Sequence, residues 1–281
     1  MVVSYLLILE LPAVRIFTRN EGATLGSTVP LHSFEDPVNG LTVDRGGIIR
    51  GPRNRQELAL MFAGGLFSEG AKTILDTLRE RHLAASFFLT GDFLQVQRHR
   101  RLVERIVADG HYLGPHSHRH LLYCAWDNCS TTLVTRDEFV TDLDRNLADL
   151  STYGPIRDEM RFWLPPYEWY NRTIASWSRE QNMTLLNFTP GTRSHTDWAP
   201  RHHRAFVPSQ VIVQGILDHE QRDADGLNGF LLLMHLGAGP ERADKLHRFL
   251  APLLDILLDR GYRFERIDVL LKDAAKRGPG R

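Results

Sequence analysis

Short apolar runs alternate with longer amphipathic segments along most of the chain. Runs rich in apolar, β-branched and aromatic residues predict strands at 57–62, 84–90, 161–166, 184–190, 229–235 and 262–267, and a strand that runs into a loop at 111–120. Apolar residues spaced three and four apart predict helices at 68–82, 100–110, 135–150 and 243–261. The pattern therefore divides the chain into alternating strands and helices.

The helix ends carry their own signals. Ser68 is the expected N-cap of the first helix, Gly110 stops the second, and Thr135 with Glu138 fits a capping box for the third. Strand and helix alternate about seven times, which favours parallel strands with right-handed crossovers. Because no glycine-rich phosphate loop opens the first helix, the pattern favours a closed α/β barrel over an open sheet.

The two ends of the chain differ from its centre. Residues 1–50 are rich in turn formers and show no clear period, so we treat them as an N-terminal extension of uncertain structure. Residues 51–275 form the expected barrel domain, and 276–281 a frayed tail. The apolar start of the chain resembles a signal peptide only poorly, because it lacks a basic n-region and Glu10 interrupts it.

Composition excludes several classes of function. Apolar residues make up 42% of the chain, while Lys plus Arg and Asp plus Glu number 34 each, so the formal net charge is zero. This balance argues against a nucleic-acid binder or a polybasic membrane binder. No apolar run approaches the roughly 20 residues of a membrane span. Cys124 and Cys129 are too few for a disulfide framework and can be a local disulfide or two thiols.

The predicted strand ends carry most of the candidate chemistry, as the barrel architecture requires. In "HSHRH", His116 and His120 are four residues apart, a spacing that suits two zinc ligands, although a His-rich surface loop is the plain alternative. A rival set, His116 and His120 with Cys124 and Cys129, gives a closed structural zinc site. Four ligands in one short loop are crowded, however.

Two further strand ends suggest catalysis and sugar binding. His235 ends the most apolar strand and is either a hydrogen-bonded core histidine or a general acid. Two prolines precede Tyr167, so its amide is held rigidly and can face a substrate oxygen, unless the segment is only a structural turn. Tyr167, Trp169 and Tyr170 have flat rings with polar edges, which suit stacking on a sugar.

These motifs in this order resemble the polysaccharide deacetylase family, the NodB-homology carbohydrate esterases, over about residues 46–268. The segments that carry the resemblance are "MFAGG" (61–65), "HSHRH" (116–120), "LPPY" (164–167), "DW" (197–198) and "LLMH" (232–235). The second fully matches the family pattern H-[ST]-x-x-H. The segments "GGIIRG", "HLLYCAW" and "NFTPGTRS" are similar to a bacterial branch with unassigned substrates. The resemblance implies a distorted, TIM-like (β/α)7 barrel that usually acts outside the cytoplasm.

The resemblance also implies roles for individual residues. The family holds a divalent metal, usually zinc, on two His and one Asp, while a second Asp acts as base and a last His as acid. His116 and His120 match the metal ligands and His235 the acid. Ala63 stands at the position of the base and Gly64 at that of the metal-binding Asp. The arginine that braces the base in the family is Leu164 in this chain.

Other side chains are candidates to replace the missing acids. Glu168 follows Tyr167 and is the expected partial substitute, while Asp92, Asp127 and Asp197 are weaker candidates. A surface carboxylate is the plain alternative for Glu168. The Asp197–Trp198 pair fits the fourth motif loosely and is expected to contact substrate, and His118 is expected to point away from the site.

The sequence therefore favours a metal-dependent deacetylase, with Zn²⁺ as the expected ion and an N- or O-acetylated sugar or polysaccharide as substrate. A carbohydrate-binding pseudoenzyme on the same barrel is the first alternative, since the acids are absent from "FAGG" (residues 62–65). A protein whose structural zinc organises an interaction surface is the second.

Overall fold

Parallel strands form the centre of the fold. The computed structural model describes residues 35–38 and 40–272. One parallel sheet contains β4 (Glu57–Gly64), β5 (Ser86–Leu89), β6 (Tyr112–Pro115), β9 (Leu231–His235) and β10 (Arg263–Phe264). A second contains β7 (Phe162–Trp163) and β8 (Thr184–Leu185). The strands predicted from the sequence are all present, and several are shorter than predicted.

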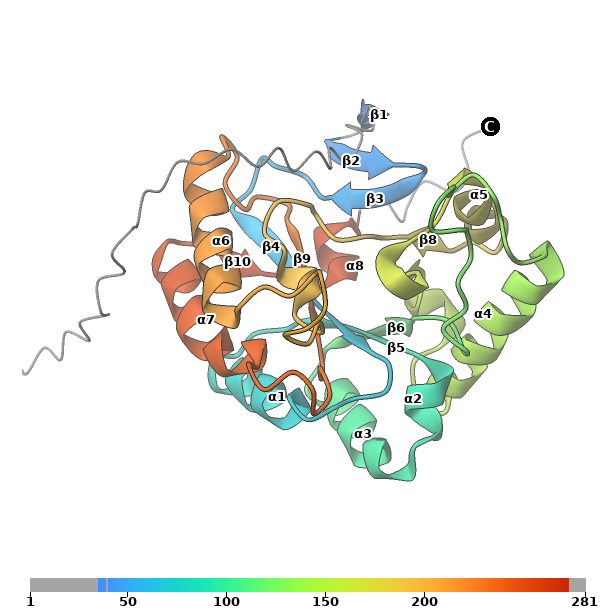
Figure 1. Cartoon of the computed structure of the whole chain (residues 1–281), viewed down its shortest axis with the longest axis horizontal. Coiled ribbons are helices and arrows are strands. Elements are labelled where there is room, and N and C mark those ends of the chain that lie inside the picture. Colours follow the sequence, from blue (N-terminus) through green and yellow to red (C-terminus); the bar gives the residue numbers. More distant parts are fainter. Residues whose placement is uncertain (1–34, 39, 273–281) are drawn as a thin grey trace, which may run out of the picture. The chain divides into compact units, whose positions relative to one another are not determined.

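Backbone hydrogen bonds join the two sheets on both sides. Leu164 N donates to Pro115 O at 3.2 Å, which links β7 to β6, and Thr189 N donates to Leu231 O at 3.0 Å, which links the segment after β8 to β9. Since β9 also pairs with β4, the strands follow one another around a distorted (β/α)7 barrel. The predicted α/β barrel is thus confirmed, and Figure 1 shows the helices around these strands.

Helices α1 (Ala71–Glu80), α2 (Gly91–Gln95), α3 (Arg100–Ala108), α4 (Arg136–Ser151), α5 (Arg172–Glu180), α6 (Ser209–Arg222), α7 (Leu250–Asp259) and α8 (Ile267–Leu270) connect or follow the strands. The capping box of Thr135 and Glu138 at α4 is confirmed. The predicted cap of α1 is wrong: Gly70 is the N-cap, and Ser68 Oγ lies 2.9 Å from His99 Nε2. The Ser68 hydroxyl therefore links α1 to the turn before α3.

The last long helix begins later than predicted. Its first turn is a 3-10 helix at Leu246–Phe249, and α7 follows directly. Arg242 Nε donates to Asp244 O at 2.6 Å, so the guanidinium occupies a carbonyl that a helix starting at residue 243 would use. The side-chain contact therefore replaces the first helical turn.

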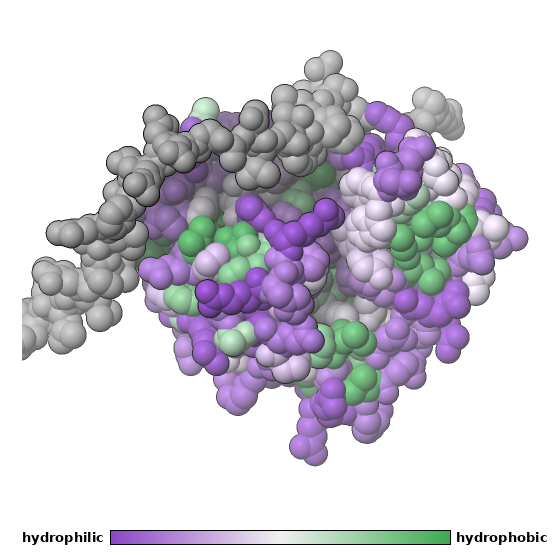
Figure 2. Space-filling model, in the orientation of Figure 1, coloured by the Kyte–Doolittle hydropathy of each residue, from purple (hydrophilic) through white to green (hydrophobic). Residues whose placement is uncertain are grey.

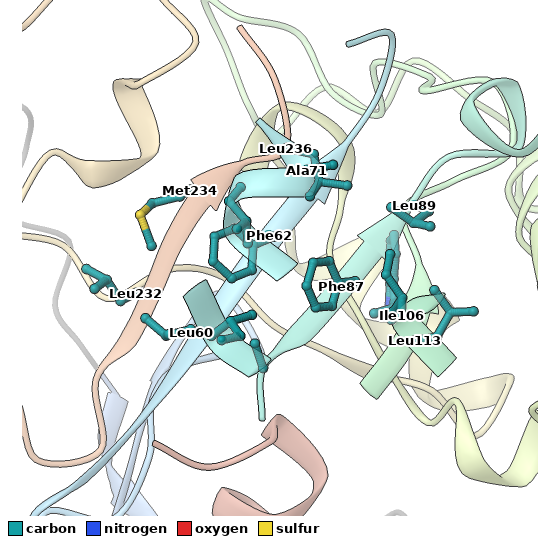
Figure 3. Packing of buried hydrophobic residues seen from close by; sticks show 14 of the residues in the cluster. Leu60, Phe62, Ala71, Phe87, Leu89, Ile106, Leu113, Leu232, Met234 and Leu236 are labelled. Atoms are coloured by element: carbon teal, nitrogen blue, oxygen red, sulfur yellow. The ribbon is translucent and has the colours of Figure 1, made fainter. Parts of the chain in front are cut away.

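Two layers of apolar side chains fill the fold, and β4 contributes to both. Leu58, Leu60 and Phe62 belong to the layer between strands and helices, while Ala59, Met61 and Ala63 face the barrel interior. This follows from the two-residue period of a strand. Figure 3 shows Phe62 beside Phe87, whose ring centroids are 5.2 Å apart.

A three-stranded antiparallel sheet, whose last two strands form a hairpin, precedes the barrel. It contains β1 (Glu35–Val38), β2 (Leu41–Asp44) and β3 (Gly47–Arg50). Arg45 and Gly46 both have positive φ, 46° and 85°, as a two-residue type I′ turn requires. Ile48 pairs with Leu186, so residues 41–50 lie against the barrel strands, which the sequence did not predict. Most of the predicted extension (1–34) and the tail (276–281) fall outside the described residues. In the described part, no helix combines the length and apolar character that crossing a membrane requires.

Candidate functional site

The two predicted metal ligands face each other where β6 ends. The ring centroids of His116 and His120 are 5.0 Å apart, with an angle of 68° between the ring planes. His116 Nδ1 lies 2.9 Å from Leu164 O and, as donor to this carbonyl, leaves Nε2 as the acceptor. Burial lowers the pKa of His120 to about 4, and burial together with His120 holds that of His116 well below its usual range. Both imidazoles are therefore neutral at pH 7.

Helix α4 holds the histidine loop from behind, a role the sequence did not predict. The buried Asp142 carboxylate accepts from Ser117 Oγ at 2.5 Å, His118 N at 2.8 Å and Arg119 N at 3.1 Å. Asn146 Oδ1 accepts from His116 N at 2.9 Å. The sequence did contain a signal for this role: Asp142 and Asn146 are polar residues four apart within the apolar stripe of α4. Polar groups on a buried helix face need hydrogen-bond partners.

His118 points away from the pair, as expected. Its Nδ1 lies 2.8 Å from Asp149 Oδ2, although the angles do not make this contact a hydrogen bond. The ring packs so closely on Gly91 that a Cβ at position 91 would lie 1.9 Å from Nδ1. A glycine is therefore required at the start of α2.

His235 ends β9 and forms a pair with Asp197. Its Nδ1 is 2.6 Å from Asp197 Oδ1, and its backbone N donates to Asp197 Oδ2 at 3.0 Å. Burial lowers the pKa of His235, but the charge and hydrogen bond of Asp197 outweigh burial, so the pKa is raised. Both oxygens of Asp197 accept hydrogen bonds, and the residue is 5% exposed. The expected substrate contact is thus a partner of His235, while the neighbouring Trp198 is 38% exposed.

The end of β4 carries no acid. Ala63 pairs in register with His235, so the two side chains lie on the same face of neighbouring strands. Gly64 faces the other way: a Cβ there would lie 2.5 Å from Leu89 Cδ2 and 3.0 Å from Leu236 Cδ1. A Cβ at Gly65 would meet no atom within 4 Å. An acid at position 64 would therefore enter an apolar layer. An acid at position 63 would lie on the same face as His235, and one at position 65 would extend into open space.

Glu168 interacts electrostatically with His235 and Asp197. Burial raises its pKa to about 7, with His235 opposing the shift and Asp197 adding to it. Its carbonyl accepts from Asn187 Nδ2 at 2.8 Å, which ties the turn to the segment after β8. A carboxyl group whose pKa lies near neutral pH suits a proton acceptor or donor. The weaker candidates Asp92 and Asp127 are exposed.

The backbone around the site is strained. Four non-glycine residues in the histidine loop and the Pro165–Glu168 segment have left-handed φ: Ser117 (70°), His120 (53°), Tyr167 (59°) and Glu168 (54°). Each such residue costs about 1–3 kcal/mol and persists only where the surroundings fix it, and functional sites concentrate such residues. The strain lies in the two turns that bring the histidine loop and the Pro165–Glu168 segment together.

Exposed aromatic rings extend the site from His120 outward. The ring of Tyr167 is 4.3 Å from that of His120, and Trp126 lies 5.4 Å from Tyr167 and 5.8 Å from Trp169. Trp126 is 59% exposed and Tyr167 44%. We call Trp126, Tyr167 and Trp169 the aromatic platform. Trp126 was not predicted from the sequence, because its loop shows no period that reveals which way the side chain faces.

Tyr170 does not belong to the platform. It is 2% exposed, and its hydroxyl donates to Asp44 O at 2.8 Å. The ring therefore has no face to offer a sugar, and it instead supports the hairpin at β2.

The donor set for a metal is incomplete in the part of the chain that the structure describes. Within residues 35–38 and 40–272, no three His, Cys, Asp or Glu side chains are grouped to hold an ion. His116 and His120 give two donors, and the tautomer of His116 is the one a ligand needs. The rival set is not assembled either: Cys124 and Cys129 lie against each other, with 2.8 Å between the sulfur atoms, but among the described residues they are not grouped with His116 and His120. The residues present thus do not complete a zinc site.

Two surface hollows of about 420 Å³ lie beside the site, and neither is lined by His116, His120 or His235. One is bordered by the histidine loop and α4, the other by the loops that follow β4 and β9. Figure 2 shows that hydrophilic residues cover most of the face in view, with hydrophobic residues in separate areas.

Comparisons with known proteins give consistent matches. A sequence model described as polysaccharide deacetylase matches residues 50–186. A peptidoglycan-N-acetylglucosamine deacetylase of Bacillus cereus is 25% identical over 230 residues, which cover 81% of this chain and 72% of that protein. The peptidoglycan-N-acetylglucosamine deacetylase PgdA of Listeria monocytogenes is 25% identical over 78% of this chain, which spans only 39% of that relative.

Solved structures share the fold. The family 4 carbohydrate esterase PdaA of Bacillus subtilis has a TM-score of 0.65 and 18% identity, covering 86% of this chain and 96% of that one. A pseudoenzyme of the same esterase family from Bacillus anthracis has a TM-score of 0.62 and 20% identity, covering 82% and 70%. A mutant of that pseudoenzyme is described as having restored enzymatic activity.

Proposed function

Because the chain belongs to the polysaccharide deacetylase family, we propose that its strand-end site recognises an acetylated glycan, with N-acetylglucosamine polymers as the ligand class. One observation carries the proposal: the neutral histidine pair, the His235–Asp197 pair and the exposed aromatic platform meet at one end of the barrel, while the acid positions are occupied by Ala63 and Gly64. The site thus keeps the side chains that can bind a sugar but lacks the acids that hydrolysis in this family requires.

The aromatic platform supplies the main contact with the sugar. The apolar face of a pyranose ring stacks on Trp126 or Tyr167, whose rings are the most exposed of the site. The acetamide of the same or the next sugar then lies along the edge of the Tyr167 ring and contacts the histidine pair. The ring centroids of Tyr167 and His120 are 4.3 Å apart. Neutral His Nε2 atoms accept or donate hydrogen bonds without the desolvation cost of a charge.

Zinc hydrolysis is not part of this proposal. A catalytic zinc needs three protein ligands and an open position. His116 and His120 supply two, and the position of the third is the side-chain-free Gly64, whose Cβ direction leads into the apolar layer. The zinc expected from the sequence thus lacks a ligand and a base together.

Residual deacetylation is the second candidate, and the pKa of Glu168 near 7 favours it. Glu168 as carboxylate takes a proton from a water molecule while the water oxygen attacks the acetamide carbon. His235 uses Nδ1 for Asp197, so its Nε2 carries the proton that goes to the leaving amine. The products are acetate and a free amino sugar.

The experiment measures binding and hydrolysis in the same sample. Penta-N-acetylchitopentaose is titrated calorimetrically into wild type, Trp126→Ala and the control Ile156→Ala, which removes a side chain of similar exposure (61%) elsewhere. We expect Trp126→Ala to weaken binding about tenfold, or ~1.4 kcal/mol, and Ile156→Ala to leave it unchanged. Absent binding by wild type, or equal binding by Trp126→Ala, overturns the proposal.

Acetate release decides between the candidates. We expect none from wild type if the site only recognises the glycan. Release that Glu168→Gln abolishes establishes the second candidate instead. Release that persists in Glu168→Gln overturns the role of Glu168.

A further inference from the structure

The two cysteines of the chain form a close thiol pair outside the histidine site. Cys124 Sγ and Cys129 Sγ are 2.8 Å apart, and both are free thiols. Cys124 is fully buried, while Cys129 is partly exposed. Because the chain contains no other cysteine, each has one possible partner within the same molecule.

The fold, and not a chance collapse of the loop, holds the sulfur atoms together. Cys124 pairs with Thr132 in an antiparallel bridge, and Leu133 N donates to Tyr123 O at 2.9 Å across the same two segments. On the other side, Asn171 Nδ2 donates to Cys129 O at 2.9 Å. The loop between the cysteines is therefore anchored at both ends.

The surroundings assign different roles to the two thiols. Arg45 Nη1 donates to Cys129 Sγ at 3.2 Å, and Cys129 Sγ donates to Tyr170 O at 3.1 Å. Cys129 is also the one that solvent reaches. Burial and, to a smaller degree, the neighbouring Cys129 raise the pKa of Cys124. Cys129 is therefore the attacking thiol and Cys124 the resolving one.

We propose that Cys124 and Cys129 are a redox modification site that closes as a disulfide by exchange with a low-molecular-weight disulfide. Cys129 thiolate attacks one sulfur of the reagent R–S–S–R, and the first thiol RSH leaves after taking up a proton. Cys124 then loses its proton and attacks Cys129 Sγ in the mixed disulfide, which releases the second RSH. Two protein thiols are oxidised, and one reagent disulfide is reduced to two thiols.

The disulfide fixes the aromatic platform. Trp126 lies inside the closed loop and stacks on Trp169 with an interplanar angle of 24°. Trp169 Nε1 donates to Ala125 O at 3.2 Å, so the neighbour of Cys124 is part of the same arrangement. Closing the loop removes the freedom of Trp126 to leave Trp169, which preorganises the platform. This consequence rests on the proposed function, whereas the disulfide itself does not.

The chemical test uses the full chain, reduced and then freed of reductant. Ellman titration in denaturant should find two thiols before treatment with oxidised glutathione and none afterwards. Intact mass should show the loss of two hydrogens, with no glutathione adduct and no dimer. In Cys129→Ser the buried Cys124 should keep its one thiol. Two remaining thiols, a stable adduct or a cross-linked dimer in wild type overturns the proposal.

Binding of penta-N-acetylchitopentaose then tests the link to the platform. We expect the oxidised form to bind several-fold more tightly than the reduced form and Cys129→Ser to resemble the reduced form. Equal binding by both forms overturns the link to the platform. Disulfide formation without binding in either form overturns the proposed function alone, so the two failures are distinguishable.

Discussion

Asp197 and His235, 38 residues apart in the chain, share a hydrogen bond of 2.6 Å between Oδ1 and Nδ1. The second oxygen of Asp197 accepts the backbone N–H of His235 at 3.0 Å. The carboxylate therefore fixes the ring, its tautomer and the strand end together. Because Asp197 raises the pKa of His235, the same pair makes the free energy of unfolding depend on pH.

Asp197→Asn should destabilise the protein more at pH 5 than at pH 9. The folded-state pKa of His235 is raised above its ordinary value, so the contribution of the ion pair is present below pH 6.5 and is lost as the pH rises through the folded-state pKa. We expect a loss of about 1–3 kcal/mol at pH 5, measured by urea unfolding. The same loss at both pH values would contradict this linkage, and NMR titration should show a lower pKa of His235 in the variant.

Glu168→Gln should stabilise the protein at pH 8 and leave it unchanged at pH 4. The pKa of Glu168 is raised to about 7 in the fold, so the wild type loses stability as the pH rises from about 4.5 to 7. The neutral isostere removes this loss, which we expect to be worth about 1–3 kcal/mol. Chemical unfolding at the two pH values measures it. A stabilisation of equal size at pH 4 would show that packing, and not charge, is responsible.

Acid replacements at the end of β4 should differ according to position. Ala63→Asp with Gly65→Asp should fold and bind zinc more tightly than wild type, because position 63 pairs with His235 and a side chain at position 65 has open space, so both acids fit at this strand end. Ala63→Asp with Gly64→Asp should be less stable than that variant by about 1–3 kcal/mol, since the side chain at 64 meets Leu89 and Leu236. Calorimetric zinc titration and thermal unfolding measure the two effects. Equal stability of the double variants would show that the strand end rearranges freely.

Oxidation of the Cys124–Cys129 pair should raise the melting temperature. Closing this short loop lowers the entropy of the unfolded chain, which stabilises the fold by about 2 kcal/mol. For a domain of this size we expect a rise of about 4–8 °C. Scanning calorimetry of the oxidised and reduced forms measures it, and Cys129→Ser treated with the same oxidant is the control. A lower melting temperature after oxidation would mean that the disulfide strains the fold.

Arg242→Met should destabilise the loop that carries Asp197. The buried guanidinium donates to Ala199 O at 2.8 Å and Val207 O at 2.9 Å, and these carbonyls lose their partner in the variant. We expect a cost of about 3 kcal/mol or more in urea unfolding. The pKa of His235 should also fall, because Asp197 is no longer held in place. An unchanged pKa of His235 would restrict Arg242 to a purely structural role.

The sequence by itself determined the alternation of strands and helices, the histidine pair and the loss of acids from the end of β4. Each of these follows from residues close together in the chain. The apolar period selects strand or helix, and parallel strands bring their carboxyl ends to one side. Ser68 shows the limit of such local rules. Its position in the sequence suits an N-cap of α1, but its hydroxyl instead contacts His99, which belongs to another segment.

Only the tertiary structure decided which side chains meet. Asp197 became the partner of His235, Asp142 the support of the histidine loop, and Trp126 part of the platform, while Tyr170 was buried under the hairpin. These contacts join residues 23 to 126 positions apart in the chain. A periodic pattern fixes the face of an element, but the orientation of an irregular loop depends on what packs against it. The side chains of such loops therefore acquire their roles only when the barrel is assembled.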